Sequence, residues 1–450
     1  MSEPARGHIA TLRGIGRMAV DATTGVADLV QALHARIAQR PTRLGGPLVS
    51  GAINGITDLV YDSVRGATRV VGGGLDAVLA QLAPLVDALG NDRAPGAAPA
   101  RPREALVAAL NGVLGDYLEA TGNPLAIRMT LRCEGVPLLL TRAGLAVALP
   151  AATSQPLVLV HGLCMNDLQW QRRAAPVPDL PGAEFAAGAG RPVAPTPAGA
   201  AEAPPHDHGA ALARDLGFTP VYLHYNGGRH ISTNGRDFAA QLDALVAAWP
   251  VPIDRLVIVG HSMGGLVARS AWHYGCAAGQ AWPQQLRALA CLGSPHQGAP
   301  LERGGHWVDL LLERLPYTAP FARLGQVRSA GIKDLRHGSV LDDDWKRPPD
   351  QGRHPLPLPA GVACFALAAT LTRAPAGSGA VQRIDALARA PARLRGDGLV
   401  PVASALGRHA DPRLELAFAP ASQALAWQCN HLDLLSAPAV YAQLRAWLRA

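Results

Sequence analysis

The sequence has few aromatic residues and few cysteines. Aromatic residues make up 5% of the 450 residues, and none of the six cysteines stands at C-x-x-C spacing from another. This spacing excludes the common zinc and thioredoxin-like motifs. Cysteines this sparse are typical of a reducing compartment, so we expect a cytoplasmic location.

The sequence also lacks long apolar or basic runs. No stretch reaches the roughly 18 uninterrupted apolar residues of a transmembrane helix. The first residues contain no continuous apolar segment before a small-residue cleavage site, so no secretory signal is expected. The net charge of +7 comes from 41 basic and 34 acidic side chains. No Lys/Arg cluster or recognition motif accompanies this charge, so we expect no nucleic-acid partner.

The first 95 residues predict an N-terminal helical region. Apolar residues recur at helical spacing over residues 8–90, and the segment that starts at Thr24 resembles the segment that starts at Asn54. Two interpretations remain open. The region is either a small helical unit packed on the main domain, or a surface that makes peripheral contact with a membrane or a partner. Residues 91–102 predict a linker.

Residues 103–450 are predicted to form one α/β domain, large enough for an enzyme domain. Helices are expected near 104–119, over 237–249 and, as a closing helix, over 438–448, and a hairpin is expected over 129–140. Between them, helices alternate with the expected strands 157–160, 219–225, 255–259, 286–292, 362–371 and 414–418. The alternation predicts a mostly parallel sheet with helices on both faces. Residues 299–355 interrupt it with an apolar segment at 307–312, which suggests a lid.

The clearest chemical motif is Gly260-His261-Ser262-Met263-Gly264. It directly follows the predicted strand 255–259 and precedes a helical run over 266–274. A serine on such a sharp strand-to-helix turn is held in a strained conformation that exposes its hydroxyl above the sheet, and the flanking glycines leave room for the turn. The pattern predicts Ser262 as a nucleophile.

A serine nucleophile needs a base and an acid that orients the base. In the strand-turn-helix arrangement the chain order is serine, then an acid, then histidine. Asp397 and His431 both stand in turn-like segments after predicted strands and fit this order. The pair His409 and Asp411 is the competing candidate. The acidic run at 342–344 is a further source of a carboxylate, but it is expected to be solvated.

An acyl oxyanion needs backbone N–H donors that are already in place. The residue after the nucleophile, Met263, is expected to supply one donor. The loop after Val160 reads His161-Gly162-Leu163-Cys164, and Leu163 is expected to supply the other.

Five segments together carry a family resemblance. They are Val160–Leu163, Gly260–Gly265, Gly293–Gly298, Gly396–Pro401 and Asn430–Asp433. In this order they resemble the bacterial lipase and esterase branch of the α/β-hydrolase superfamily, and also the hydrolase domain of inositol-deacylase-like proteins. The resemblance covers about residues 127–450.

The resemblance implies an α/β-hydrolase fold with a Ser262, Asp397 and His431 triad, an oxyanion hole at Leu163 and Met263, and a lid. It further suggests His161 and His296 as residues that face the substrate, although His296 is equally expected to have a structural role and is not expected to be the base. Some secreted lipases of this branch hold calcium through an aspartate two positions after the catalytic histidine, where Asp433 stands. The matching upstream aspartate is absent from 374–381, so neither a metal nor a cofactor is expected.

The sequence therefore predicts a serine ester hydrolase, a carboxylesterase or lipase that acts on lipid-like acyl esters. The same triad would serve an acyltransferase, thioesterase or amidase. A scaffold or membrane-docking protein with an idle hydrolase domain is the alternative from another class, suggested by the N-terminal helices.

Overall fold

The computed structural model describes residues 101–172, 205–299, 329–346, 352–375, 377, 379–383 and 396–449. The predicted helical region over 1–95, most of the linker, and the apolar segment 307–312 of the insertion lie outside these residues. Within the described residues, every helix is too short or too polar to cross a membrane.

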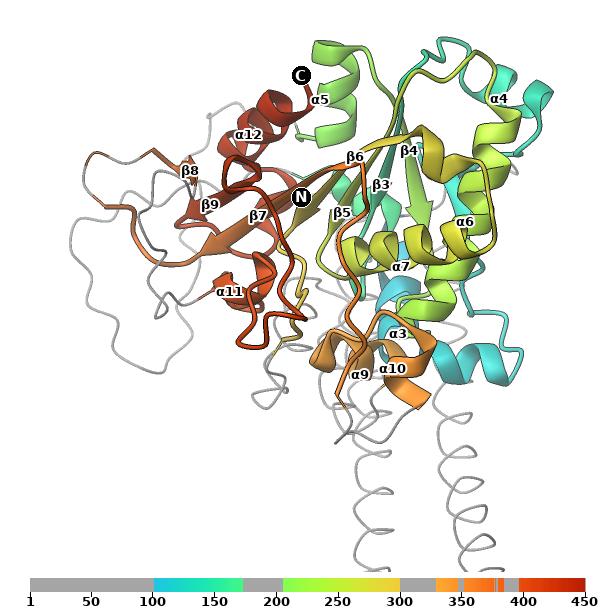
Figure 1. Cartoon of the computed structure of the whole chain (residues 1–450). Helices are drawn as coiled ribbons and strands as arrows, with labels where there is room; N and C mark the ends of the chain where they lie inside the picture. The colour runs from blue at the N-terminus through green and yellow to red at the C-terminus, as the bar shows by residue number, and fades with distance from the viewer. Residues whose placement is uncertain are drawn as a thin grey trace, which may run out of the picture.

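One sheet organises the described part of the chain, where it contains nine strands in the order β2-β1-β4-β3-β5-β6-β7-β9-β8 (Figure 1). The strands are β1 (Thr130–Cys133), β2 (Val136–Pro137), β3 (Pro156–Val160), β4 (Thr219–His224), β5 (Leu256–His261), β6 (Leu286–Leu292), β7 (Ala363–Thr370), β8 (Val381–Arg383) and β9 (Gln423–Trp427). The six strands from β4 to β9 in this order run parallel. The outer strands β1 and β8 pair antiparallel with them, and β2 pairs antiparallel with β1.

Helices cover both faces of the sheet, as expected for right-handed crossovers between parallel strands. The longer helices are α3 (Arg101–Ala120), α5 (His208–Leu216), α6 (Ile231–Ala248), α7 (Met263–Ala277), α9 (Ala330–His337) and α12 (Pro438–Leu448). Short ones are α4 (Arg142–Ala148), α10 (Asp342–Lys346), α11 (Val402–Ala405) and the 3₁₀ turns η1 (Asp167–Trp170), η2 (Trp282–Gln285), η7 (Pro420–Ser422) and η8 (Asp433–Leu435). Helices α6 and α7 pack together on one face, and α5 lies beside α12 on the other (Figure 1).

The predicted mostly parallel α/β sheet is confirmed, and several bounds agree closely. Strand β6 and helix α12 have the predicted limits, and the hairpin over 129–140 appears as β1 and β2. Helix α6 begins at Ile231, six residues before the predicted start at Asp237. The first N–H of the helix has an acceptor from a distant part of the chain, because the Asp334 carboxylate accepts the Ile231 N–H at 2.8 Å.

The predicted last strand over 414–418 is wrong. These residues make local and loop contacts instead: the Leu416 N–H donates to the Gly407 carbonyl, and the Gln297 side-chain amide donates to the Leu414 carbonyl. The last parallel strand is β9, where Ala424 pairs with Leu367 of β7. Its short apolar run is buried throughout, so β9 rather than 414–418 extends the core.

Helix α3 lies outside the alternating part of the chain but is built into the same core. Leu106, Leu110, Leu114 and Leu118 recur every four residues, which places them on one face, and all four are fully buried. The helix also approaches neighbouring backbone closely at its glycines. A Cβ atom at Gly112 would lie 2.2 Å from the Cys164 sulfur, so only glycine fits that contact.

If α3 belongs to the core, its leucines carry stability. We expect Leu110→Ala to lower the free energy of unfolding by about 2–5 kcal/mol, since it removes a buried side chain and leaves a cavity. Leu139→Ala is the matched control, because Leu139 is 68% exposed; it should change stability by less than about 0.5 kcal/mol. Equilibrium urea unfolding measures both, and equal effects of the two substitutions would contradict the packing of α3.

Candidate active site

The turn at Ser262 joins β5 to α7 and holds the serine in an unusual backbone conformation. Ser262 has φ 55° and ψ −123°, which side-chain-bearing residues rarely adopt. The neighbouring glycines make the turn feasible: a Cβ atom at Gly260 would lie 2.5 Å from the Gly265 nitrogen, and one at Gly264 would lie 2.3 Å from the Val160 oxygen. Such strain costs about 1–3 kcal/mol and persists only where the surrounding structure imposes it.

The surroundings of Ser262 fix its position at the carboxyl ends of β3, β5 and β6. Its N–H donates to the Leu292 carbonyl at 2.8 Å. On the other side lies Gly162, where a Cβ atom would come within 3.0 Å of the Ser262 Cβ. The Ser262 hydroxyl is buried and has no hydrogen-bond partner within the described residues. The hydroxyl thus lies between the loop after β3 and the end of β6.

Asp397 and His431 are in direct contact, as the sequence order predicts. The His431 Nδ1 lies 2.7 Å from Asp397 Oδ2, and both side chains are almost completely buried. The other carboxylate oxygen accepts the N–H groups of Leu399 at 2.9 Å and Val400 at 2.8 Å. These two donors fix the orientation of the carboxylate beside the imidazole. The carboxylate orients the imidazole so that Nδ1 carries the proton and Nε2 is left as the basic atom.

Two contacts bring this pair to the end of β6, where Ser262 lies. A Cβ atom at Gly293 would meet Asp397 Oδ2 at 3.2 Å and His431 Cε1 at 3.3 Å. His261, which precedes Ser262, donates from its Nε2 to the His431 carbonyl at 2.9 Å, and the two rings lie 4.7 Å apart. The side chain of the residue before the serine therefore links the serine turn to the backbone at the histidine.

The contact made by His261 was not predicted from the sequence, where His261 counted only as the variable position of the serine motif. Burial, together with the nearby His431, keeps the pKa of the His261 imidazole well below its usual value. The side chain is therefore neutral and acts as a hydrogen-bond donor. The only sequence signal for this role is its position next to the serine.

The expected oxyanion donors lie on both sides of Ser262. Met263 is the first residue of α7, where backbone N–H groups have no acceptor within the helix. Leu163 follows Gly162, the residue packed against Ser262, and is buried. Cys164 comes next with φ 58°, so the loop after β3 turns sharply at this point.

The two histidines predicted to face the substrate are both buried. His161 donates from Nδ1 to the Gly162 carbonyl at 2.8 Å, accepts the Tyr225 N–H at Nε2 and stacks on the Tyr225 ring. His296 accepts from the Arg269 guanidinium at 3.4 Å and lies beside Phe418. His161 thus supports the loop after β3, and the substrate contacts of both histidines stay a prediction.

The alternative acids and the calcium position have other partners. Asp411 is ion-paired with Arg413 at 2.7 Å. Asp344 was expected to be solvated, but its side chain is buried and accepts the Val340 and Leu341 N–H groups. Asp433 Oδ2 accepts the Asn430 N–H at 3.0 Å, which stabilises the turn that carries His431.

The sheet order and the strained serine turn define the fold as that of an α/β-hydrolase, which confirms the predicted fold class. Within that class, residues 151–353 match the family model described as "PGAP1-like alpha/beta domain". The predicted resemblance to the α/β-hydrolase superfamily is therefore confirmed over this segment.

Solved structures with related chain traces include a lipase and an esterase. The lipase BlEst2 of Bacillus licheniformis, in its mature form, is 17% identical over 67% of this chain and 93% of its own, with a TM-score of 0.37. Naproxen esterase (carboxylesterase NP) from Bacillus subtilis is 12% identical over 65% of this chain and 82% of its own, with a TM-score of 0.34. No curated protein sequence matches this one.

Buried neutral histidines make stability depend on pH. Burial lowers the pKa values of His161, His208, His261 and His296, that of His161 to about 3. The unfolded chain takes up protons below pH 6.5 that the folded chain does not. Stability should therefore fall as pH drops below about 6.5, with each imidazole contributing at most about 1.4 kcal/mol per pH unit.

Urea unfolding at pH 7, 6 and 5 measures this dependence. His208→Gln should reduce the loss of stability towards pH 5, because it removes one group that titrates only in the unfolded chain. The exposed His409 provides the control, and His409→Gln should leave the slope closer to that of the parent. A free energy of unfolding that is constant from pH 7 to pH 5 would contradict the buried neutral state.

Proposed function

We propose that the protein is a serine hydrolase that cleaves carboxylic esters through Ser262, His431 and Asp397. The observation that carries the proposal is the pairing of a strained serine turn with a buried His431–Asp397 contact at the same strand ends. Serine alone is a weak nucleophile near neutral pH, and this set provides the base and the orienting acid that it needs.

In the proposed mechanism, Ser262 Oγ attacks the ester carbonyl carbon while His431 Nε2 takes the hydroxyl proton. The oxyanion accepts hydrogen bonds from the N–H groups of Leu163 and Met263. His431 then gives its proton to the leaving alcohol, and an acyl-enzyme forms. Water, deprotonated by His431, attacks the acyl carbon, and the second collapse releases the acid and restores Ser262. Asp397 stays ionised and stabilises the imidazolium in each step.

Substitution of the nucleophile tests the proposal. Ser262→Ala should lower the turnover of p-nitrophenyl esters on the order of a million-fold, since the attacking oxygen is removed. A fluorophosphonate probe should label the parent at Ser262 and leave Ser262→Ala unlabelled. Ser422→Ala, in the distant turn η7, serves as control and should behave like the parent. A Ser262→Ala protein that hydrolyses the esters at the parent rate would refute the assignment.

Substitution of the acid tests the role of the His431–Asp397 contact. Asp397→Asn keeps the size of the side chain but favours the wrong imidazole tautomer, so turnover should fall about 10⁴-fold. Asp411→Asn, at the competing position, should leave turnover within about twofold of the parent, because Asp411 is ion-paired with the exposed Arg413. If turnover fell more in Asp411→Asn than in Asp397→Asn, Asp411 rather than Asp397 would be the orienting acid.

We further propose a lipid-like acyl ester as the substrate class, on the support of the apolar segment 307–312 and of the apolar helices that the sequence predicts over residues 1–95. The same helices are the proposed site of peripheral membrane contact. With the full chain, kcat/KM for p-nitrophenyl esters should rise from acetate to longer acyl chains. A steady fall over the series would favour a small soluble ester, and ester products formed with a competing alcohol would indicate acyl transfer.

A further inference from the structure

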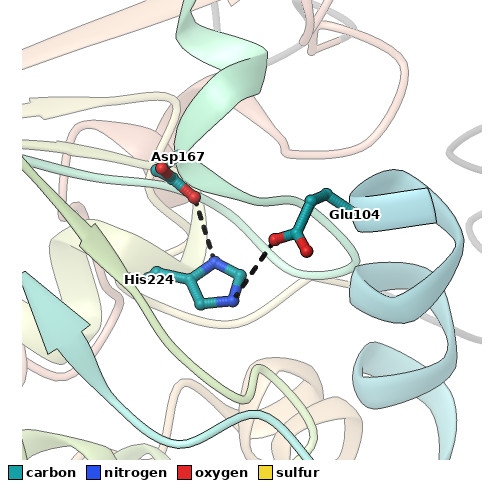
Figure 2. Close-up of side chains that lie close together, drawn as sticks. All are labelled: Glu104, Asp167 and His224. Carbon is teal, nitrogen blue, oxygen red and sulfur yellow. Dashed lines mark ion pairs between the residues drawn. The ribbon is translucent and has the colours of Figure 1, made fainter. Parts of the chain in front are cut away.

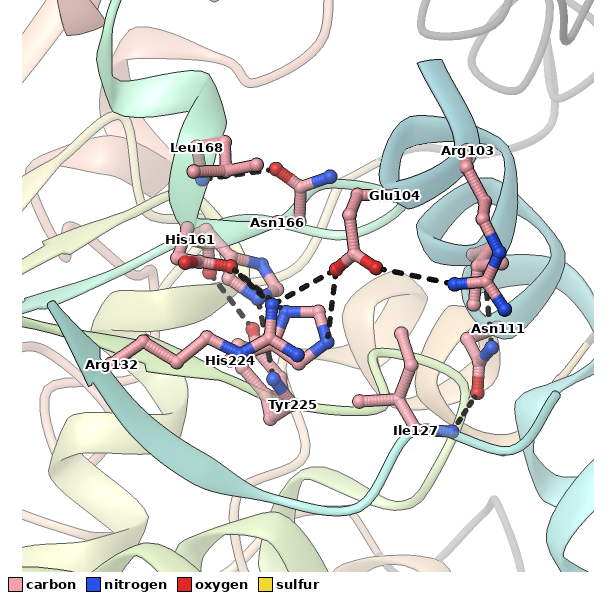
Figure 3. Close-up of polar contacts among 12 residues, drawn as sticks. Arg103, Glu104, Asn111, Ile127, Arg132, His161, Asn166, Leu168, His224 and Tyr225 are labelled. Atoms are coloured by element: carbon pink, nitrogen blue, oxygen red, sulfur yellow. Dashed lines mark hydrogen bonds and ion pairs between the residues drawn. The ribbon is translucent and has the colours of Figure 1, made fainter. Parts of the chain in front are cut away.

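Four charged or titratable side chains from four elements, three of them buried and Arg132 mostly so, meet beside the oxyanion loop, residues 161–166 (Figures 2 and 3). They are Glu104 from the first turn of α3, Arg132 from β1, Asp167 from η1 and His224 from the end of β4. All four side chains are at most 13% exposed. We call this set the buried charge cluster.

The members of the buried charge cluster pair with one another. Arg132 Nη1 lies 2.9 Å from Glu104 Oε2 and 3.2 Å from Asp167 Oδ1, so one guanidinium group bridges two carboxylates. His224 Nδ1 lies 3.1 Å from the same Asp167 oxygen, and its Nε2 lies 3.9 Å from Glu104 Oε2. Because buried charges are costly without partners, loss of one member destabilises the others.

The pKa of Asp167 agrees with a cluster whose members depend on one another. Burial would by itself raise the pKa of the Asp167 carboxyl, but the neighbouring His224 imidazole, together with Arg132, holds this pKa below its usual value. The carboxyl and imidazole atoms lie within 4.8 Å of one another, a spacing that could also suit a cation. Here the Arg132 guanidinium already supplies the positive charge between the carboxylates.

The buried charge cluster holds the oxyanion loop at its two ends. Asp167 directly follows the loop, and its side chain is tied to Arg132 and His224. Tyr225 directly follows His224, and its hydroxyl donates to the carbonyl of His161, the first loop residue, at 2.9 Å. The same tyrosine ring stacks on His161 with 4.4 Å between centroids (Figure 3).

Helix α3 contacts the same loop at its middle. Cys164 packs against Gly112 so closely that any side chain at position 112 would overlap the Cys164 sulfur. Glu104, two turns earlier on α3, reaches the cluster that holds Asp167 (Figure 2). The helix thus fixes both the middle and the end of the loop that carries Leu163.

We propose that Glu104, Arg132, Asp167 and His224 are positioning residues that hold the oxyanion loop, and through it the Leu163 N–H, in the geometry needed for catalysis. The proposal rests on the proposed function, because it assigns these residues an effect on the rate of acyl transfer. None of the four contacts the reacting atoms. In this arrangement α3 supports catalysis as part of the same domain, although it precedes the matched segment 151–353.

Glu104→Gln is the test variant, since it removes one buried charge and keeps the shape of the side chain. Glu119→Gln is its matched control on the same helix, where the 52% exposed Glu119 pairs with Arg229, outside the buried charge cluster. Activity is expressed per fluorophosphonate-labelled site, well below the melting temperature of each variant. In Glu104→Gln, kcat should fall about 10–100-fold, as expected for a misplaced oxyanion donor, while KM stays within about threefold.

A merely structural role would lower the melting temperature and the labelled fraction of Glu104→Gln but leave kcat per labelled site at the parent value. That result would overturn the proposal, as would an equal loss of kcat in Glu119→Gln. Zn²⁺ or Ca²⁺ added to EDTA-treated protein provides a further comparison. If either ion raised the melting temperature of the parent but not that of Glu104→Gln, the cluster would be a cation site and the positioning proposal would be overturned. No effect of the ions supports the positioning proposal.

Hydrogen exchange of residues 161–170 separates this proposal from the proposed function, because it needs no turnover. Exchange should be faster than in the parent in Glu104→Gln and unchanged in Glu119→Gln. A parent that neither reacts with the probe nor hydrolyses esters would refute the proposed function, and faster exchange would still support the positioning of the loop. Unchanged exchange in Glu104→Gln would overturn the positioning proposal even in a fully active parent.

Discussion

The left-handed backbone conformation of Ser262 is the constraint around which the site is built. It requires a strand that ends and a helix that begins at one residue, and glycines where any side chain would overlap backbone atoms. The sheet absorbs this local cost because β5 lies between two buried parallel strands. The neighbouring segments take their positions from the turn: β6 accepts the serine N–H, and His261 donates to the backbone of His431.

Two different electrostatic environments lie at the carboxyl ends of the parallel strands. Around Ser262, the buried imidazoles of His161 and His261 are neutral and donate to backbone carbonyls. Beside the oxyanion loop, Glu104 and Asp167 instead share the positive charge of one guanidinium group. The first arrangement fixes the loops around Ser262 without adding charge there. The second binds α3 and β1 to the loop by paired charges, which resist displacement because no member can separate without exposing an unpaired partner.

The sequence predicts those features that depend on local pattern. The strand-turn-helix around Ser262, the bounds of β6 and the approach of Asp397 to His431 all follow from residue spacing and motif order. Features that depend on distant contacts could not be predicted. The early start of α6 requires Asp334, more than a hundred residues away, and the buried charge cluster joins Glu104 to His224 across four elements. Residues 414–418 have a strand-like composition, but Gln297 and Gly407 hold them outside the sheet.

The antiparallel pairing of β1 with β4 bears on where this folding unit begins. The segment similar to known domains starts at residue 151, after both strands of the hairpin. A polypeptide shortened to that point would leave one side of β4 with unsatisfied amide and carbonyl groups next to the buried Val221 and Leu223. An uncovered strand of this kind is a template for self-association. The limit of sequence similarity is therefore not the limit of the cooperative structure, which extends back at least to the first turn of α3.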